Sequence, residues 1–107
     1  MTVHYIDNIG TYAEAVSAAK QVLLEFGADW CSPCKAMRPI LEDFAKNNPE
    51  IIVCAVDVEG SGLEDILGQY KVRSLPTFIH LENGAETSRI IGTAKRNELT
   101  ELVKRNK

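Results

Sequence analysis

The sequence has few cysteines, and their number is odd. Three cysteines among 107 residues are too few for the disulfide framework that replaces a large hydrophobic core in small secreted domains. In a reducing compartment, a close pair of cysteines more often catalyses a reaction or binds a metal than stabilises the fold. The pair Cys31 and Cys34 is therefore the first candidate for a functional site.

The sequence also lacks an excess of positive charge and any long apolar run. Its 12 basic and 15 acidic residues give a net charge of −3, which provides no electrostatic footprint for nucleic acid or an anionic membrane. No apolar run approaches the roughly 20 residues of a membrane-spanning helix. The segment 1–7 has neither a basic stretch nor the apolar core of a signal peptide. We therefore expect a cytoplasmic protein without nucleic-acid or membrane partners.

The composition that is present suits one globular domain. Hydrophobic residues make up 45% of the chain and charged residues 25%, which is ordinary for such proteins. The length allows one hydrophobic core, and no linker, repeat or low-complexity segment divides it. We expect residues 1–107 to form a single domain.

Hydrophobic periodicity predicts about five strands and about four helices in the order βαβαβαββα. Strands are expected at 3–6, 22–26, 51–57, 76–81 and 88–91, and helices at 9–20, 32–47, 63–70 and around 99–103. Asn83-Gly84 favours a tight hairpin between the last two strands, because both residues tolerate positive φ. This order indicates an α/β fold with helices on both faces of a mixed sheet, parallel strands early and a hairpin late.

Cys31 and Cys34 lie where an apolar strand passes into a helix. The two intervening residues let both sulfurs meet across one helical turn. The unpaired N–H groups and the positive end of the helix dipole favour an anion. The pKa of Cys31 is therefore expected to be depressed, and Cys31 to be the nucleophile. Pro33 fits the first helical turn, where a proline forfeits no hydrogen bond.

Two metal-centred alternatives exist for the cysteine pair. A structural zinc site needs about four ligands, and only Cys54, His4 and His80 remain, without motif spacing. A c-type haem needs a histidine at the position of Lys35. A redox pair without a metal is therefore favoured.

From its first strand to its last helix, the chain resembles the thioredoxin family. The resemblance rests on Phe26, Pro39, Gly92 and three segments: Ala28-Asp29-Trp30-Cys31-Ser32-Pro33-Cys34-Lys35, Val72-Arg73-Ser74-Leu75-Pro76-Thr77 and Asn83-Gly84. A Cys-x-x-Cys motif alone is weak, but Trp-Cys-x-Pro-Cys-Lys after a strand, followed by the later prolines, is very specific. The resemblance implies the thioredoxin fold over essentially the whole chain.

The resemblance also implies a protein-disulfide reductase cycle. In it Cys31 attacks a substrate disulfide, and Cys34 resolves the mixed disulfide that forms. Pro76 matches the family's cis-proline beside the cysteines, and Glu25 matches a buried aspartate that relays the proton of the second cysteine. The implied electron donor is an NADPH-dependent thioredoxin reductase, and we expect a monomer without a bound cofactor.

A flat apolar substrate surface around the dithiol is implied as well. Its residues would be Trp30, Ser32, Pro33, Leu75, Ile91, Gly92 and Thr93. The chain departs from the family pattern at four places. Glu25 replaces the aspartate, Gly27 stands where many members have a tryptophan, Ser32 replaces the commoner glycine, and Ala55 holds the place of a lysine near the buried acid. These departures bear on the reduction potential and the substrate preference.

Several of these residues also have plainer interpretations. We expect Cys54 to fill the core, against a regulatory or dimer-forming thiol, and His80 to be a strand residue without a catalytic role. Trp30 is assigned to the contact surface and not the core, and Pro76 to a cis and not an ordinary trans bond. Glu25 is expected to be buried and neither solvated nor paired with a lysine, because the strand around it is apolar.

Two other classes of function compete with the reductase. An oxidant or isomerase is disfavoured by the missing signal peptide and by Ser32-Pro33, because such proteins generally carry a histidine between the cysteines. The other class is a binding module that docks through the flat apolar face, with incidental redox chemistry. Turnover of a model disulfide separates the three.

Overall fold

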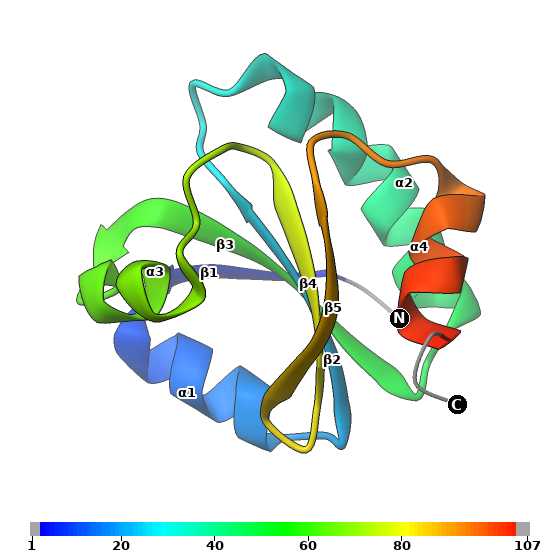
Figure 1. The fold of residues 1–107 in the computed structure, drawn as a ribbon, viewed down its shortest axis with the longest axis horizontal. Helices are drawn as coiled ribbons and strands as arrows, with labels where there is room; N and C mark the ends of the chain where they lie inside the picture. Colours follow the sequence, from blue (N-terminus) through cyan, green and yellow to red (C-terminus); the bar gives the residue numbers. More distant parts are fainter. Residues whose placement is uncertain (1–2, 105–107) are drawn as a thin grey trace.

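Helices cover both faces of a five-stranded sheet in the computed structural model, which describes residues 3–104 (Figure 1). In chain order the elements are β1 (His4–Asn8), α1 (Ile9–Ser17), β2 (Gln21–Gly27), α2 (Ser32–Asn47), β3 (Ile51–Ser61), α3 (Glu64–Tyr70), β4 (Thr77–Glu82), β5 (Ala85–Ile91) and α4 (Arg96–Lys104). The strands lie in the order β1-β3-β2-β4-β5. β1, β3 and β2 are parallel, and β4 and β5 are antiparallel to their neighbours. The predicted mixed sheet is confirmed.

β2 is the middle strand and is buried on both faces, as its continuous apolar run predicts. Alternate side chains of a strand point to opposite faces of the sheet. Val22, Leu24 and Phe26 pack with α1 and α3, whereas Leu23 packs with α2 and α4. Glu25 has the parity of Leu23 and therefore lies on the α2 side. The strand thus places one carboxyl group beneath the helix that starts at the cysteine pair.

Several element boundaries differ from the prediction, among them the ends of α1 and β3. α1 ends at Ser17 and not near Lys20; Lys20 lies beside the hairpin turn, where its carbonyl accepts a hydrogen bond from the Asn83 N–H at 2.8 Å. β3 continues past the predicted end to Ser61, because Ser61 pairs with Asn8 of β1 after a register shift. Both boundaries depend on contacts between segments that are distant in the sequence.

The turn between β4 and β5 has the expected conformation. Asn83 and Gly84 have φ angles of 53° and 83°, the left-handed pair that matches the twist of the flanking strands. Pairing begins directly at the turn, with Glu82 opposite Ala85, so β5 starts earlier than the predicted Ser88. Across the described part of the chain, no helix has the length and hydropathy to cross a membrane.

Candidate active site

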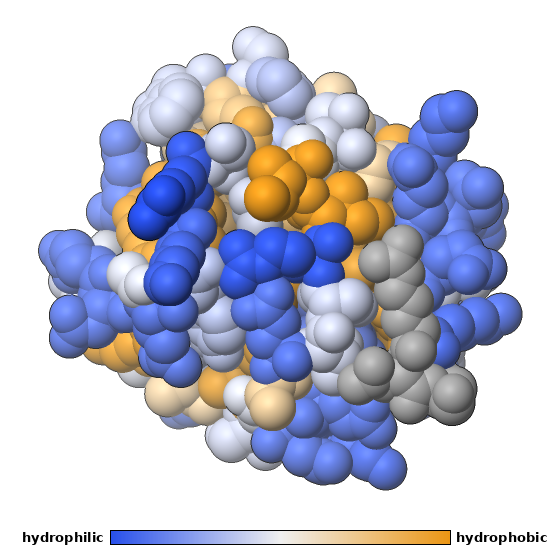
Figure 2. Space-filling model, viewed as in Figure 1, coloured by the Kyte–Doolittle hydropathy of each residue, from blue (hydrophilic) through white to orange (hydrophobic). Residues whose placement is uncertain are grey.

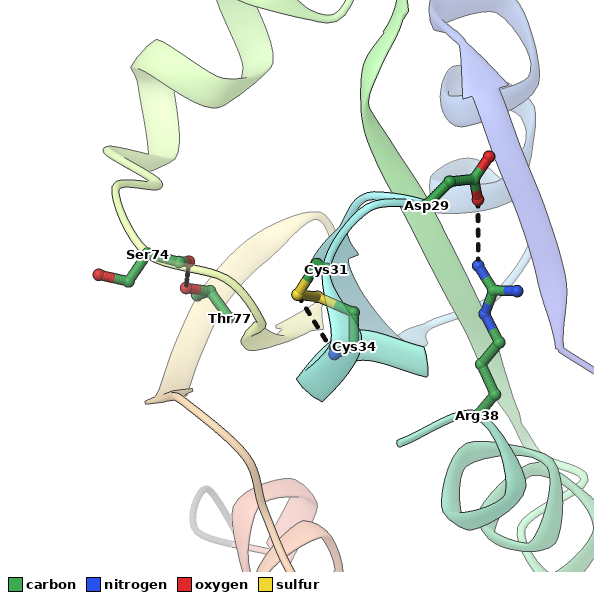
Figure 3. Close-up of a disulfide and its surroundings, with 6 residues drawn as sticks. All are labelled: Asp29, Cys31, Cys34, Arg38, Ser74 and Thr77. Atoms are coloured by element: carbon green, nitrogen blue, oxygen red, sulfur yellow. Dashed lines mark hydrogen bonds and ion pairs between the residues drawn. A yellow bond between two sulfur atoms is a disulfide. The ribbon is translucent and has the colours of Figure 1, made fainter. Parts of the chain in front are cut away.

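The cysteine pair occupies the start of α2. Cys31 immediately precedes the first helical turn, and Cys34 lies in that turn together with Pro33. The two sulfurs are joined in a disulfide with the Cα atoms 5.3 Å apart, and the Cys34 N–H donates a hydrogen bond to Cys31 Sγ at 3.2 Å (Figure 3). After reduction, a thiolate at Cys31 is stabilised by the same N–H group and by the helix dipole. The local structure therefore favours the anion at Cys31.

Three apolar residues pack around the disulfide: Ala28, Val58 and Leu75. Both cysteines are nearly buried, Cys31 being 5% and Cys34 3% exposed. A substrate must therefore dock on the surface around the pair before its own disulfide meets Cys31.

The segment beside the disulfide contains a cis peptide bond between Leu75 and Pro76, as the resemblance to the family implied. Thr77 Oγ1 donates a hydrogen bond to the Ser74 carbonyl at 2.6 Å (Figure 3). The Gly92 N–H donates to the Pro76 carbonyl at 2.8 Å. These two hydrogen bonds hold the segment in place between the cysteines and the end of β5.

Trp30 is a surface residue and not a core residue, as predicted, since it is 66% exposed. Its Nε1–H donates a hydrogen bond to Glu59 Oε2 at 3.0 Å. The sequence did not indicate this contact, because Glu59 lies on the part of β3 beyond the predicted strand end. A groove of about 290 Å³ next to Trp30 is lined by Val58, Leu67, Val72, Arg73 and Leu75.

The end of β5 adds a second exposed apolar side chain. Ile91 is 64% exposed and lies opposite Thr77. Figure 2 shows apolar surface over this end of β5, with hydrophilic side chains around it. The seven residues predicted for the substrate surface thus lie on three segments: the start of α2 and its approach (Trp30, Ser32, Pro33), the loop before β4 (Leu75), and the end of β5 (Ile91, Gly92, Thr93).

Glu25 is buried, as predicted. It is 3% exposed, and its Oε2 atom has no hydrogen-bond partner in the described structure. Burial raises the pKa of Glu25 to about 7, and the positive charge of Arg38 opposes this rise. A carboxyl group with a pKa near neutral can both accept and return a proton at physiological pH.

A cavity of about 140 Å³ is lined by both Glu25 and Cys34. Gly27 lines it too and contributes no side chain; a Cβ atom there would lie 3.0 Å from Cys34 Sγ. Glycine at this position therefore leaves room next to the second cysteine. The charged residues on the other walls of the cavity are Asp7, Asp29, Arg38 and Asp57.

Cys54 and His80 lie in other surroundings. Cys54 is fully buried in the core beneath α1 and α3, and burial raises its pKa to about 12, so the thiol stays protonated near neutral pH. The ring nitrogens of buried His80 lie 2.6 Å from Thr87 Oγ1 and 3.1 Å from Gln21 Oε1. Within residues 3–104, no three His, Cys, Asp or Glu side chains converge as metal ligands.

Comparison with known proteins agrees with the geometry of the site. The thioredoxin family model matches residues 3–105. Thioredoxin H-type 1 of Nicotiana tabacum is 36% identical over 92 residues, which cover 86% of this chain and 71% of the relative. A thioredoxin of Mycoplasmoides gallisepticum is 35% identical over 100 residues, which cover 94% and 98%.

Solved structures are similar over almost the full chain. A mutant thioredoxin from Halobacterium salinarum matches with a TM-score of 0.86 and 25% identity, covering 97% of this chain and 89% of that one. The Plasmodium falciparum thioredoxin matches with a TM-score of 0.83 and 25% identity, covering 98% and 100%.

Proposed function

The chain belongs to the thioredoxin family, and from that premise we propose that it reduces protein disulfides with the thiols of Cys31 and Cys34. Members of the family are protein-disulfide oxidoreductases, and this chain has the Cys-x-x-Cys pair joined as a disulfide. The protein is therefore a thiol-disulfide oxidoreductase. The observation that carries the assignment of roles is the hydrogen bond from the Cys34 N–H to Cys31 Sγ at the start of α2.

The proposed reaction starts from the dithiol. The Cys31 thiolate attacks one sulfur of the substrate disulfide, forms a mixed disulfide and expels one substrate thiolate. Cys34 then loses its proton and attacks Cys31 Sγ, which closes the Cys31–Cys34 disulfide and releases the second substrate thiolate. Two electrons thus pass from the protein to the substrate, whose two sulfurs end as thiols after protonation.

Glu25 is the proposed acceptor of the Cys34 proton. Both residues line the same cavity, and the pKa of about 7 at Glu25 suits an acid–base group that acts near neutral pH. Cys31 needs no such base, because the helix start already stabilises its anion. Glu25 is therefore proposed to act on the resolving step and not on the first attack.

The proposed substrate surface surrounds the disulfide. Trp30 and Ile91 supply exposed apolar area, and the backbone at Leu75–Pro76 lies beside the cysteines to receive an extended substrate segment. Ser32, Pro33, Gly92 and Thr93 complete the surface. Such an apolar area beside the reacting sulfurs favours a protein substrate over a small disulfide.

The electron donor and the compartment are proposed from the same family membership. Thioredoxin reductase is the usual donor for this family, and we assign an NADPH-dependent thioredoxin reductase to this chain. Donor-driven reduction keeps the pair in the dithiol form, which suits a reducing compartment such as the cytoplasm. The chain is proposed to act there as a monomer.

The equilibrium of the Cys31–Cys34 pair with glutathione tests the direction of the reaction. A reductase is expected at about −270 mV, as in thioredoxins, whereas a strong disulfide-introducing oxidant lies at about −120 mV. The Cys54→Ala variant, which keeps only the reactive pair, is the control that assigns the titrating thiols. A potential in the oxidant range, or failure of the dithiol to reduce insulin disulfides, would contradict the proposal.

A further inference from the structure

Three residues form a row across the sheet on the side that faces α2. In the register of the parallel strands, Tyr5 of β1 lies opposite Ala55 of β3, and Ala55 lies opposite Glu25 of β2. Neighbouring strands are about 4.8 Å apart, so Tyr5 and Glu25 flank the small side chain of Ala55. The shortness of Ala55 leaves space above the sheet between them, and this space belongs to the cavity that all three line.

Arg38 of α2 covers this row. It lies one helical turn after Cys34, at the i+4 position, and so shares a helix face with it. Its guanidinium lies 5.6 Å from the centre of the Tyr5 ring and 3.4 Å from Asp29 Oδ1, and Figure 3 shows the side chain extending toward Asp29. These two contacts hold the positive charge on the wall of the cavity that also contains Glu25 and Cys34.

We propose that Arg38 is a positioning residue for disulfide exchange, whose charge, acting across the cavity above Ala55, sets how readily Glu25 takes and releases the Cys34 proton. The inference rests on the proposed role of Glu25 as the proton acceptor. This role of Arg38 also explains the cavity, because Glu25 Oε2 is buried there without a hydrogen-bond partner in the described structure. A positive charge nearby is what such a carboxylate requires when it ionises.

The other charged residues that line the cavity are acidic. Asp7 and Tyr5 face it from β1, Asp57 from β3, and Asp29 from the segment before α2. These three acidic residues bring no positive charge to the cavity. Among the described residues that line the cavity, Arg38 is the only cation, and its charge lowers the pKa of Glu25 against the effect of burial.

The position of the charge also accounts for one departure from the family pattern. The sequence has Ala55 where a lysine near the buried acid is usual in the family. Arg38 supplies a positive charge from the helix above the strand, and a long side chain at position 55 would occupy the space through which that charge acts.

An NMR titration of the Glu25 carboxyl carbon, in the oxidised full chain with isotope-labelled glutamate, tests the inference directly. Arg38→Gln is expected to raise the pKa of Glu25 by about 0.5 to 1. This is less than the 1–3 that a close opposite charge gives, because the Arg38 side chain is 42% exposed and water screens it. Arg38→Lys, which keeps the charge, should restore most of the wild-type value.

Lys46→Gln is the matched control for the net charge. Lys46 lies in the last turn of the same helix and does not line the cavity, so its loss should leave the titration of Glu25 unchanged. An unchanged pKa in Arg38→Gln, or an equal shift in Lys46→Gln, would overturn the inference without touching the proposed role of Glu25.

The second measurement is the pH profile of a single turnover of the reduced protein with insulin, followed by the fluorescence of Trp30, the only tryptophan in the chain. The profile of Arg38→Gln should shift in the alkaline direction, the same direction as the shift seen by NMR. If the pKa of Glu25 shifts in the NMR titration but the pH profile of the turnover does not, Arg38 does not act in the reaction. If Glu25→Gln also keeps the wild-type profile, the fault lies in the proposed role of Glu25 and not in its coupling to Arg38.

Discussion

Single residues underlie the roles that we propose for the two sulfurs. Cys31 Sγ accepts an N–H group at the start of α2, whereas Cys34 lies inside the first turn and lines the cavity shared with Glu25. An anion is therefore stabilised at Cys31 by the helix itself, while Cys34 is proposed to lose its proton to Glu25. We therefore propose that two thiols of the same chemistry have different functions because of their positions on one helical turn.

Replacing each cysteine by serine separates these functions. Cys31→Ser is expected to abolish disulfide reduction, because the nucleophile is lost. Cys34→Ser is expected to attack once and accumulate the mixed disulfide, since no second thiol resolves it. Mass spectrometry after mixing with oxidised insulin detects the adduct on Cys31. A comparable adduct on Cys34 in the Cys31→Ser variant would contradict the assignment.

Gly27 lies directly against Cys34. A Cβ atom here would lie 3.0 Å from Sγ and 3.1 Å from Cβ of Cys34. Gly27→Ala is expected to lower the free energy of unfolding of the oxidised protein by about 1–3 kcal/mol, the usual cost of overpacking. It should also slow the resolving step, because Cys34 is displaced. Chemical denaturation measures the first effect and single-turnover reduction of insulin the second.

Gly68→Ala is the matched control for this substitution. Gly68 lies in α3 with no atom within 4 Å of the added methyl group, and alanine is favoured over glycine in a helix by about 0.5–1 kcal/mol. The variant should be at least as stable as the wild type and turn over at the same rate. Equal losses of stability in both variants would show that crowding of Cys34 is not the cause.

Among the elements, β2 is the strand that places a carboxyl group in the core, and this burial lowers the stability of the fold. It is paired along its length with β3 and β4, and Glu25 is its one ionisable residue. Burial raises the pKa of Glu25 from 4.5 to about 7. Between these values Glu25 binds more protons in the folded state than in the unfolded state, so its contribution to the free energy of unfolding falls as the pH rises.

Glu25→Gln is expected to remove this dependence. Below about pH 4.5 the carboxyl is protonated in both states, and the variant and the wild type should be about equally stable. As the pH rises to about 7, the free energy of unfolding of the variant should increase relative to that of the wild type. The difference should level off at about 3 kcal/mol. Urea unfolding of both oxidised proteins across this range measures it. A difference that does not vary with pH would contradict the raised pKa.

The type and order of the elements could be predicted because each is a local pattern. The apolar run of β2 and the Asn83-Gly84 turn are specified by neighbouring residues. The ends of α1 and β3 could not be predicted, because they depend on distant partners. The Asn83 N–H donates a hydrogen bond to the Lys20 carbonyl after α1, and Asn8 pairs with Ser61.

The same distinction holds for the site. Cys31 and Cys34 were evident from their spacing and flanking residues, and the resemblance added the cis bond before Pro76. Arg38 was not singled out, although its i+4 spacing from Cys34 placed it on the same helix face. Its position over Tyr5 depends on how α2 lies across the sheet, which no local pattern specifies.

At the scale of the whole molecule, the topology of the sheet brings three segments together around the disulfide. β2 ends shortly before Cys31, and the antiparallel pairing of β4 with β2 places the start of β4 at the same end of the sheet. β5 runs back along β4, so Ile91 lies at that same end of the sheet. There the Gly92 N–H donates a hydrogen bond to the Pro76 carbonyl. The apolar surface beside the cysteines is therefore a product of the fold and not of one sequence segment.

This arrangement predicts that Ile91→Ser affects protein substrates more than small ones. Ile91 is 64% exposed in the unbound protein, and a docked protein would bury it, whereas a small disulfide meets only the sulfurs. Losing part of that apolar contact should cost about 1 kcal/mol, or roughly a fivefold decrease in kcat/KM for insulin reduction. The reduction of hydroxyethyl disulfide should fall by a smaller factor.

Ile9→Ser is the control that separates docking from surface hydrophobicity in general. Ile9 is also an exposed isoleucine, 41% exposed at the start of α1, but it lies on none of the three segments around the disulfide. Its replacement should leave kcat/KM for insulin unchanged while removing a side chain of the same size. If both variants lose insulin reduction equally, or if Ile91→Ser loses both substrates to the same extent, the surface at the end of β5 does not bind the substrate. Binding would then have to come from the groove beside Trp30, and a Trp30→Ala variant would show the larger loss for insulin alone.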